Sequence, residues 1–228
     1  MSQAEQSASK KKGILQPYVW ICLAVIALIQ VIVYFGTRLL LPYLPSYKLN
    51  LPLDAAIPFI PEWVIVYDLA FVSWAVSGVL VFIQGKAHTV RFAISYTTAL
   101  ILSMVIFLAW PLTIDRPEIV GGGLARDMLR HIYEADEPNN LFPSLHVLAS
   151  YFSWRELWGC PRIPRWYKAF NLIFLLLVCL SVVFVKQHLS IDILGGIVVG
   201  EASLQIGRAI YNAYVEKENE KNLRPEEG

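Results

Sequence analysis

The sequence predicts an all-α fold, a polytopic membrane protein with a bundle of six transmembrane helices. Composition is the first reason. The 228 residues are 56% hydrophobic and 16% charged, and the mean hydropathy is +0.51, which is too apolar for an ordinary soluble domain. The second reason is that several runs reach the roughly 20 apolar residues that a helix needs to cross about 30 Å of hydrocarbon.

Four such runs are clear, and a fifth differs from them. The clear runs cover residues 18–36, 63–84, 92–112 and 167–185. The fifth, residues 189–211, contains Asp192, Glu201 and Arg208 among otherwise apolar and small residues. We expect the fifth run to be a helix packed inside the bundle.

A sixth candidate, residues 141–157, is short and carries His146 and Arg155. If it is counted, both termini lie on the same side of the membrane. More lysines and arginines then fall on the terminal side than on the other, so the positive-inside rule places the termini in the cytoplasm. We therefore expect an integral protein of the plasma membrane with an extracytoplasmic active site. Its parts are a tail at 1–17, a membrane domain at 18–211 and a tail at 212–228.

The segments outside the spans are of several kinds. Residues 37–62 are rich in Pro and Leu, which suits a loop in the outer interface. Residues 113–140 form a second external loop, in which the spacing of Arg126 and Arg130 fits a short helix. The first nine residues and those after Tyr214 are strongly polar, and we expect them to be disordered. The three cysteines form no CxxC pair, so neither a disulfide framework nor a zinc site is indicated.

Ionisable residues inside membrane segments are costly and indicate function. His188 and Asp192 are four residues apart, which places them one turn apart on one helical face. An aspartate that accepts a hydrogen bond from one imidazole nitrogen fixes the tautomer and leaves the other nitrogen basic, as a nucleophilic histidine requires. The alternative is a lone interfacial histidine beside a helix-capping aspartate.

Residues 139–146 (NNLFPSLH) are typical of a helix start, with asparagines for capping and Pro143 in the first turn. The free backbone N–H groups of such a start form a phosphate cradle. His146 then lies where it can donate a proton to a leaving group. The alternative is a capped helix whose histidine only extends to the membrane interface.

Positive side chains near the same membrane face are candidates for phosphate binding. Arg116 can make bidentate contacts to a phosphate, and Lys186, two residues before His188, offers a second charge. Arg126 and Arg130 are weaker candidates, because solvated charge is the commoner explanation in a loop helix.

Together these residues resemble the type 2 phosphatidic acid phosphatase superfamily of membrane lipid phosphatases and phosphotransferases. That family has the motifs KxxxxxxRP, PSGH and SRxxxxxHxxxD, in this order, on a six-helix core. The likeness covers roughly residues 63–207. The matching residues are Arg116-Pro117 for the first motif, Pro143-Ser144-Leu145-His146 for the second, and Ser181, His188 and Asp192 for the third.

The chain departs from the family pattern at three positions. Ala109 replaces the lysine of the first motif, Leu145 the glycine of the second, and Val182 the arginine of the third. Two phosphate-binding cations are therefore missing, and Lys186 is a candidate to replace one. With FPSLH and KQHxxxD, the chain looks more like the branch of sphingomyelin synthases and inositol phosphorylceramide synthases than that of secreted acid phosphatases.

The resemblance implies a two-step mechanism without a metal or other cofactor. His188 would attack phosphorus to give a phosphohistidine, Asp192 would orient it, and His146 would protonate the leaving group. The phosphate oxygens would be held by backbone amides and by Arg116, Ser144 and Lys186. Water as the second acceptor makes the enzyme a phosphatase, whereas an alcohol makes it a transferase.

The leading expectation is a phosphatase that hydrolyses a lipid phosphomonoester or diphosphate, such as phosphatidate or a prenyl diphosphate, at the outer leaflet. Its partners would be the lipid substrate and the bilayer. The second is a phospholipid or sphingolipid headgroup phosphotransferase that uses the same histidines. Two histidines and an aspartate are also a possible zinc set of a metal hydrolase. A non-enzymatic membrane subunit or transporter is the last alternative, although no inverted repeat favours transport.

Overall fold

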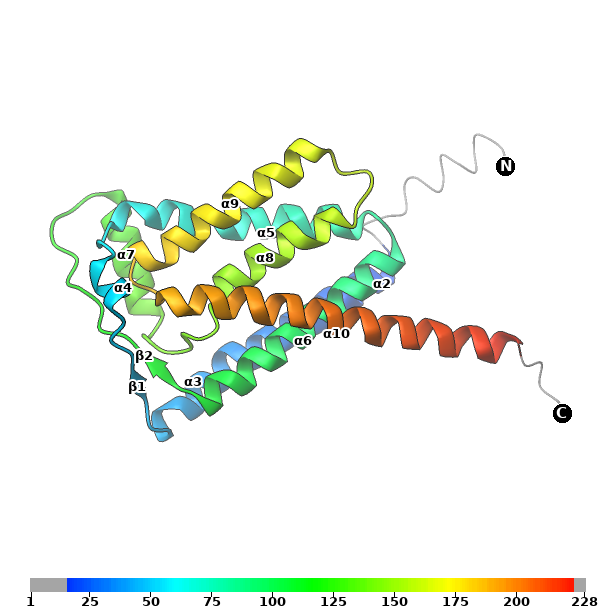
Figure 1. The fold of residues 1–228 in the computed structure, drawn as a ribbon, viewed down its shortest axis with the longest axis horizontal. Helices are drawn as coiled ribbons and strands as arrows, with labels where there is room; N and C mark the ends of the chain where they lie inside the picture. The colour runs from blue at the N-terminus through cyan, green and yellow to red at the C-terminus, as the bar shows by residue number, and fades with distance from the viewer. Residues whose placement is uncertain (1–15, 224–228) are drawn as a thin grey trace.

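A computed structural model describes residues 16–223 of the chain. Long helices lie side by side in a bundle (Figure 1). In the described residues, strand structure is limited to β1 (Tyr47–Lys48) and β2 (Leu112–Thr113), which pair in parallel. The all-α prediction is therefore confirmed apart from this short ladder.

Among residues 16–223, five helical segments are long and apolar enough to cross a membrane. The first, Pro17–Tyr43, consists of α2 (Pro17–Val31), a π-helical turn (Ile32–Gly36), α3 (Thr37–Leu40) and a 3-10 turn (Leu41–Tyr43). The other four are built on α5 (Val64–Phe82), α6 (Lys86–Ala109), α9 (Arg165–Phe184) and α10 (Ser190–Leu223). These five helices are compatible with an integral membrane protein.

The predicted sixth span is not confirmed. It corresponds to α8 (Leu145–Trp158), whose 14 residues are fewer than the roughly 20 that a span requires. The helix nevertheless lies among the long helices (Figure 1) and packs against α5, α9 and α10. Its side chains contribute to the main hydrophobic core, which includes Val147, Leu148 and Phe152.

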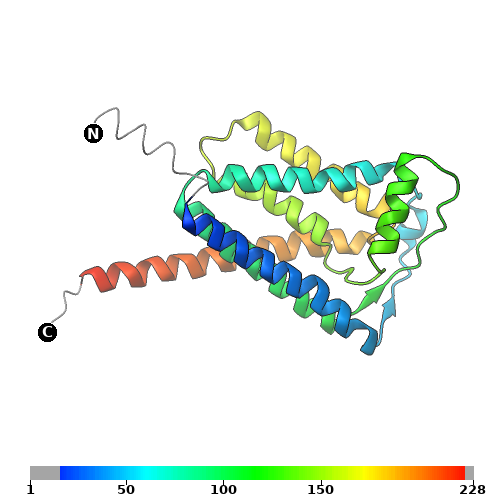
Figure 2. The same cartoon turned by 180° about the vertical axis from the view of Figure 1, so that it is seen from behind.

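The two ends of the bundle differ. The described start of α2 and the end of α10 lie at one end, whereas the strands and the short helices α4 (Pro52–Ala56) and α7 (Leu124–Ala135) lie at the other (Figures 1 and 2). The predicted short helix with Arg126 and Arg130 is therefore confirmed as α7. The segment 37–62 is more structured than the predicted loop, since it contains α3, β1 and α4.

Two predicted boundaries were wrong for the same reason. Helix α6 begins at Lys86, six residues before the predicted 92, and α10 continues to Leu223, so the residues from Tyr214 to Leu223 are helical rather than disordered. Hydropathy detects only the apolar part of a helix, whereas the glutamates and lysines after Tyr214 are strong helix formers. The predicted disorder of the first nine residues lies outside the described residues.

Glycines on α10 let neighbouring backbones approach closely. A Cβ at Gly196 would lie 2.8 Å from the Ser144 carbonyl oxygen, and one at Gly207 would lie 2.5 Å from the Ser95 Cα. This close packing allows the Ser144 N–H to donate to the Asp192 carbonyl at 3.1 Å. Helix α10 therefore fixes the start of α8 directly against the His188–Asp192 segment.

A Gly196→Ala substitution is expected to lower the free energy of unfolding by about 1–3 kcal/mol, because the new methyl group overlaps backbone atoms that cannot rotate away. The higher helix propensity of Ala offsets only about 1 kcal/mol of this cost. Thermal unfolding in detergent measures the effect. Gly122→Ala is the control, since a Cβ there meets no atom within 4 Å. Equal unfolding temperatures for the two variants would contradict the packing argument.

Candidate active site

His188 lies in the connection between α9 and α10, two residues before α10 begins. Its Nδ1 is 3.3 Å from the Asp192 Oδ2 and 3.0 Å from the Leu141 carbonyl oxygen. The Asp192 Oδ2 also accepts a hydrogen bond from the Leu189 N–H at 2.8 Å. The expected contact is present, but the histidine is not on the helix itself. Asp192 both caps the first turn of α10 and contacts the imidazole.

The carbonyl contact determines which nitrogen of His188 carries the proton. A carbonyl oxygen only accepts hydrogen bonds, so Nδ1 donates to Leu141, and the neutral ring keeps its lone pair on Nε2. The side chain is 8% exposed and Asp192 is fully buried. The ring is thus held in one orientation and one tautomer, as a nucleophilic histidine requires.

His188 lines two cavities. The first, which we call the bundle cavity, has a volume of about 350 Å³ and is lined mainly by side chains from α5, α8 and the connecting residues 136–140 and 187–188. The second, the loop cavity, has a volume of about 670 Å³ and lies among residues 48–59, 113–117 and 186–189. The candidate nucleophile is therefore accessible to a group in either cavity.

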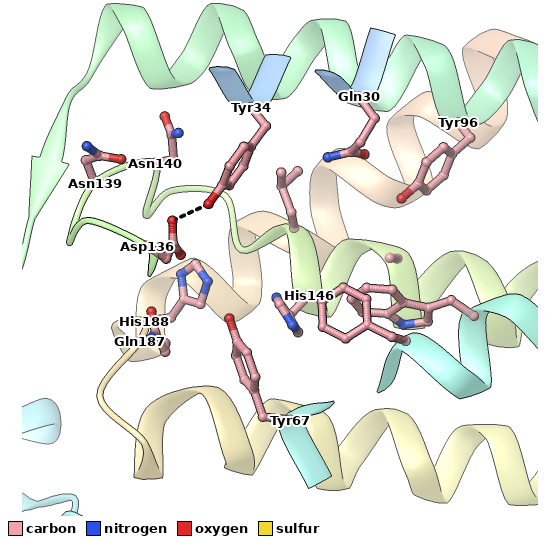
Figure 3. A pocket seen from close by; sticks show the side chains of 14 residues that line it. Gln30, Tyr34, Tyr67, Tyr96, Asp136, Asn139, Asn140, His146, Gln187 and His188 are labelled. Atoms are coloured by element: carbon pink, nitrogen blue, oxygen red, sulfur yellow. Dashed lines mark hydrogen bonds between the residues drawn. The ribbon is translucent and has the colours of Figure 1, made fainter. Parts of the chain in front are cut away.

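His146 is the second residue of α8 and lines the bundle cavity (Figure 3). Its ring stacks on Tyr67 with centroids 3.8 Å apart, and it meets Trp74 and Phe71 edge-on at 5.0 and 5.3 Å. Its Nε2 is buried and has no hydrogen-bond partner. The two histidines of the motifs therefore meet at one cavity, and the free nitrogen of His146 is available to a ligand.

Ser144 caps the start of α8 and does not reach either cavity. It is the N-cap of α8, where its Oγ accepts a hydrogen bond from the Val147 N–H at 3.4 Å, and it is fully buried. It is not among the residues that line either cavity. The prediction that Asn139 and Asn140 cap this helix was wrong, because the serine hydroxyl takes that role and the asparagines line the bundle cavity instead.

Arg116 lines the loop cavity, but much of its guanidinium is already engaged. It donates to the carbonyls of Tyr133 and Asp136 and to the Gln187 Oε1 at 2.7 Å, and it lies over the Tyr133 ring. Burial lowers the pKa of Arg116, and the charge of Asp136 opposes that shift. Only Nε is buried without a partner. Arg116 thus anchors the 133–136 backbone beside the site.

Lys186 also lines the loop cavity, and its backbone has an unusual conformation. Its φ of 51° is in the left-handed region, which is uncommon for residues other than glycine. The Nζ donates to the carbonyls of Asp54 and Ile57, at 3.1 and 2.7 Å. Burial lowers the pKa of Lys186, and the charge of Asp54 opposes this. The amine therefore links the 54–57 segment to the residues around His188.

The left-handed backbone at residue 186 predicts a difference between two substitutions. Lys186→Gly and Lys186→Met both remove the amine, but only Met keeps the steric strain of φ near 51°. We expect the Gly variant to be more stable than the Met variant by about 1 kcal/mol. Chemical denaturation in detergent measures this difference. Equal stability of the two variants would show that the position is not strained.

Sequence reasoning missed several residues of the site. The Tyr67 hydroxyl points toward the two histidines, and the Tyr34 hydroxyl donates to Asp136 at 2.8 Å (Figure 3). Gln187, beside His188 in sequence, is 2% exposed and lines the bundle cavity. Nothing in the sequence distinguishes Tyr34 and Tyr67 from the other aromatic residues of the spans.

No family model, curated protein or solved structure matches the chain. The resemblance to the type 2 phosphatidic acid phosphatase superfamily therefore rests on the three motifs alone. Within residues 16–223, three or more His, Cys, Asp or Glu side chains do not come together in a group that could hold a metal ion. The geometry available for a functional proposal is that of His188, His146 and the two cavities that His188 lines.

Proposed function

We propose that the protein is a membrane lipid phosphatase that hydrolyses a lipid phosphomonoester or diphosphate through a phosphohistidine on His188. The observation that supports this most is the fixed tautomer of His188, whose unprotonated Nε2 is the nucleophile the chemistry needs. Both motif histidines line one cavity, which gives the nucleophile and the proton donor access to the same substrate.

The proposed reaction has two steps. The His188 Nε2 attacks phosphorus, the P–O bond to the lipid breaks, and protonated His146 gives its proton to the departing lipid oxygen. Water then attacks phosphorus, passes a proton to His146, and the P–N bond breaks to release phosphate. Asp192 carries the negative charge that stabilises His188 while its ring is positive. Both histidines return to their starting states.

The two cavities suit different parts of the substrate, the loop cavity its phosphate and the bundle cavity its lipid. Arg116 and Lys186 line the loop cavity, where their positive charges favour the phosphate oxygens. Phe71 lines the bundle cavity and is 55% exposed on the outside of the bundle, which in a membrane is a surface that faces lipid. We propose that the lipid enters beside Phe71 and that the site acts at the extracytoplasmic face.

A substrate panel tests the proposal. The purified protein is incubated with ³²P-labelled phosphatidate and a labelled prenyl diphosphate, and both phosphate release and labelled protein are measured. A phosphohistidine is stable in base and labile in acid, so the trapped label should show that behaviour. Failure to release phosphate from any lipid phosphate or diphosphate would contradict the proposed function.

Headgroup phosphotransfer is the second candidate, because the two cavities give a donor and an acceptor separate approaches to His188. The same labelled lipid can be supplied together with alcohol and lipid-alcohol acceptors. Label in a new phosphoester would favour transfer. Label found only in inorganic phosphate would exclude transfer to those acceptors.

A further inference from the structure

Asp54 contacts the chain on both sides of His188. It belongs to α4, within residues 47–60, a segment that we call the strap. Its carbonyl oxygen accepts a hydrogen bond from the Lys186 Nζ at 3.1 Å. Its carboxylate accepts two hydrogen bonds from Ser190, one from the backbone N–H at 2.7 Å and one from the hydroxyl at 3.2 Å. One residue of the strap therefore bridges the ends of the pentapeptide that has the candidate nucleophile at its centre.

The strap is itself held at both ends. Its first two residues form β1, which pairs with β2, and the Lys48 Nζ donates to Asp115 at 2.6 Å. Its last residue, Ile60, donates its N–H to the Phe184 carbonyl oxygen at 2.9 Å. Helix α4 lies at the end of the bundle where α9 ends and α10 begins (Figure 1). Asp54 is therefore fixed relative to the bundle and can restrain the connection that it contacts.

The contact with Ser190 satisfies a backbone group that the helix leaves unpaired. Ser190 is the first residue of α10, and the N–H groups of a first helical turn have no acceptor within the helix. The Asp192 carboxylate accepts from the Leu189 N–H, and Asp54 accepts from the N–H that follows. Two carboxylates, one from α10 and one from the strap, thus hold the same helix start beside His188.

The Asp54 carboxylate also lines the loop cavity, where Arg116 and Lys186 are proposed to hold phosphate. A free carboxylate there could take a proton from the substrate or from water. Each of its oxygens, however, already accepts a hydrogen bond from Ser190. The geometry therefore favours a role in holding His188 in place over a role in proton transfer.

We propose that Asp54 is a positioning residue that keeps the His188 ring in its reactive orientation. It acts through Ser190 and Lys186 and not through contact with the substrate. Its effect on the rate rests on the proposed function, because that effect requires His188 to be the nucleophile. The restraint on the ring does not depend on turnover and is measured separately.

Two substitutions at Asp54 separate its position from its charge. Asp54→Ala removes both contacts with Ser190, so kcat should fall by about ten- to a hundredfold, as expected when a reacting group is slightly misplaced. Asp54→Asn removes the charge, but its amide can still accept from the Ser190 N–H and donate to the hydroxyl, so it should keep most of the wild-type kcat. Neither variant should raise KM, since neither removes a cation that binds phosphate. Glu134→Ala, at an exposed position of α7 at the same end of the bundle, is the control and should match the wild type.

NMR on detergent-purified protein with ¹⁵N-labelled imidazoles measures the restraint on His188 directly. The His188 signals are assigned by their absence from His188→Ala. At a pH where the ring is neutral, the wild type and Asp54→Asn should show one protonated and one unprotonated ring nitrogen. In Asp54→Ala the two shifts should move toward each other, because a less restrained ring samples both tautomers.

Either of two results would overturn the proposal. One is an unchanged pair of His188 shifts in Asp54→Ala. The other is a kcat of Asp54→Asn far below that of the wild type, which would assign the effect to charge and which decides the matter even if Asp54→Ala does not fold. The expected shifts in a protein that releases no phosphate would leave the restraint on His188 standing and reject the proposed function instead.

Discussion

A His188→Ala substitution is expected to reduce phosphate release by on the order of a thousandfold or more. The reason is that His188 supplies the only nitrogen in the proposed mechanism that forms a bond to phosphorus. Its Nδ1 is committed to Leu141 and Asp192, which leaves Nε2 as the reacting atom. The measurement is kcat/KM for the best lipid substrate, together with the amount of acid-labile label on the protein, which should vanish.

His131→Ala is the matched control, since His131 lies on the exposed face of α7 and lines neither cavity. It should keep the activity of the wild type. Similar activities for the His131 and His188 variants would reject the phosphohistidine mechanism. An unchanged unfolding temperature for His188→Ala shows that the lost activity is not a loss of fold.

Because the His188 Nδ1 contacts both Asp192 and the Leu141 carbonyl, the effect of replacing Asp192 can also be predicted. Where a carboxylate alone fixes the tautomer of a catalytic histidine, replacing it with the amide costs about 10⁴ in rate. Here the Leu141 carbonyl also requires the proton on Nδ1. Asp192→Asn is therefore expected to cost less, about 10- to 100-fold, because it removes charge but leaves the tautomer. A loss as large as that of His188→Ala would show that the carbonyl contact does not hold the ring.

The membrane class and the main helices could be predicted because burial in lipid imposes a strong compositional signal. The boundaries could not, since Lys86 and the residues beyond Tyr214 are polar yet helical. Helix α8 could not be placed from its hydropathy for a different reason. Its 14 residues are fewer than a span requires, and its position depends on tertiary packing against α5, α9 and α10.

The contact between His188 and Asp192 could be predicted because their spacing is local. The i to i+4 spacing of His188 and Asp192 indicates their contact, whichever residue begins the helix. Partners such as Leu141 and Tyr67 could not be predicted, because their positions depend on which helices become neighbours. The capping role of Ser144 could not be predicted either, because the motif does not show which residue begins α8.

A second large effect is expected far from the candidate site, at Glu156 in the second half of α8. This side chain is fully buried, and its carboxylate oxygens lie 3.7 Å from Arg91 of α6 and 3.7 Å from Arg208 of α10. Neither oxygen has a hydrogen bond. Glu156 therefore compensates the charge of two arginines and joins three helices through electrostatics rather than through hydrogen bonds.

A Glu156→Ala substitution is expected to lower the free energy of unfolding by about 3 kcal/mol, because two largely buried cations lose their counter-charge. Glu156→Gln keeps the shape and should lose a comparable amount, which separates the effect of charge from that of packing. Glu216→Ala, at an exposed position on α10, is the control and should change little. Chemical denaturation in detergent gives the values.

If the loss of stability in Glu156→Ala comes from uncompensated charge, removal of the two arginines as well should restore stability. A loss that came from packing would not be restored in this way. When Arg91, Glu156 and Arg208 are all replaced by leucine, no uncompensated charge is left, and well-packed apolar residues can equal or exceed a buried ion cluster in stability. The triple variant should therefore be more stable than Glu156→Ala. Its molecules that remain folded should release phosphate at the wild-type rate, because none of the three residues lines either cavity. A triple variant less stable than the single one would mean that the cluster stabilises the bundle by its geometry and not only by neutralising charge.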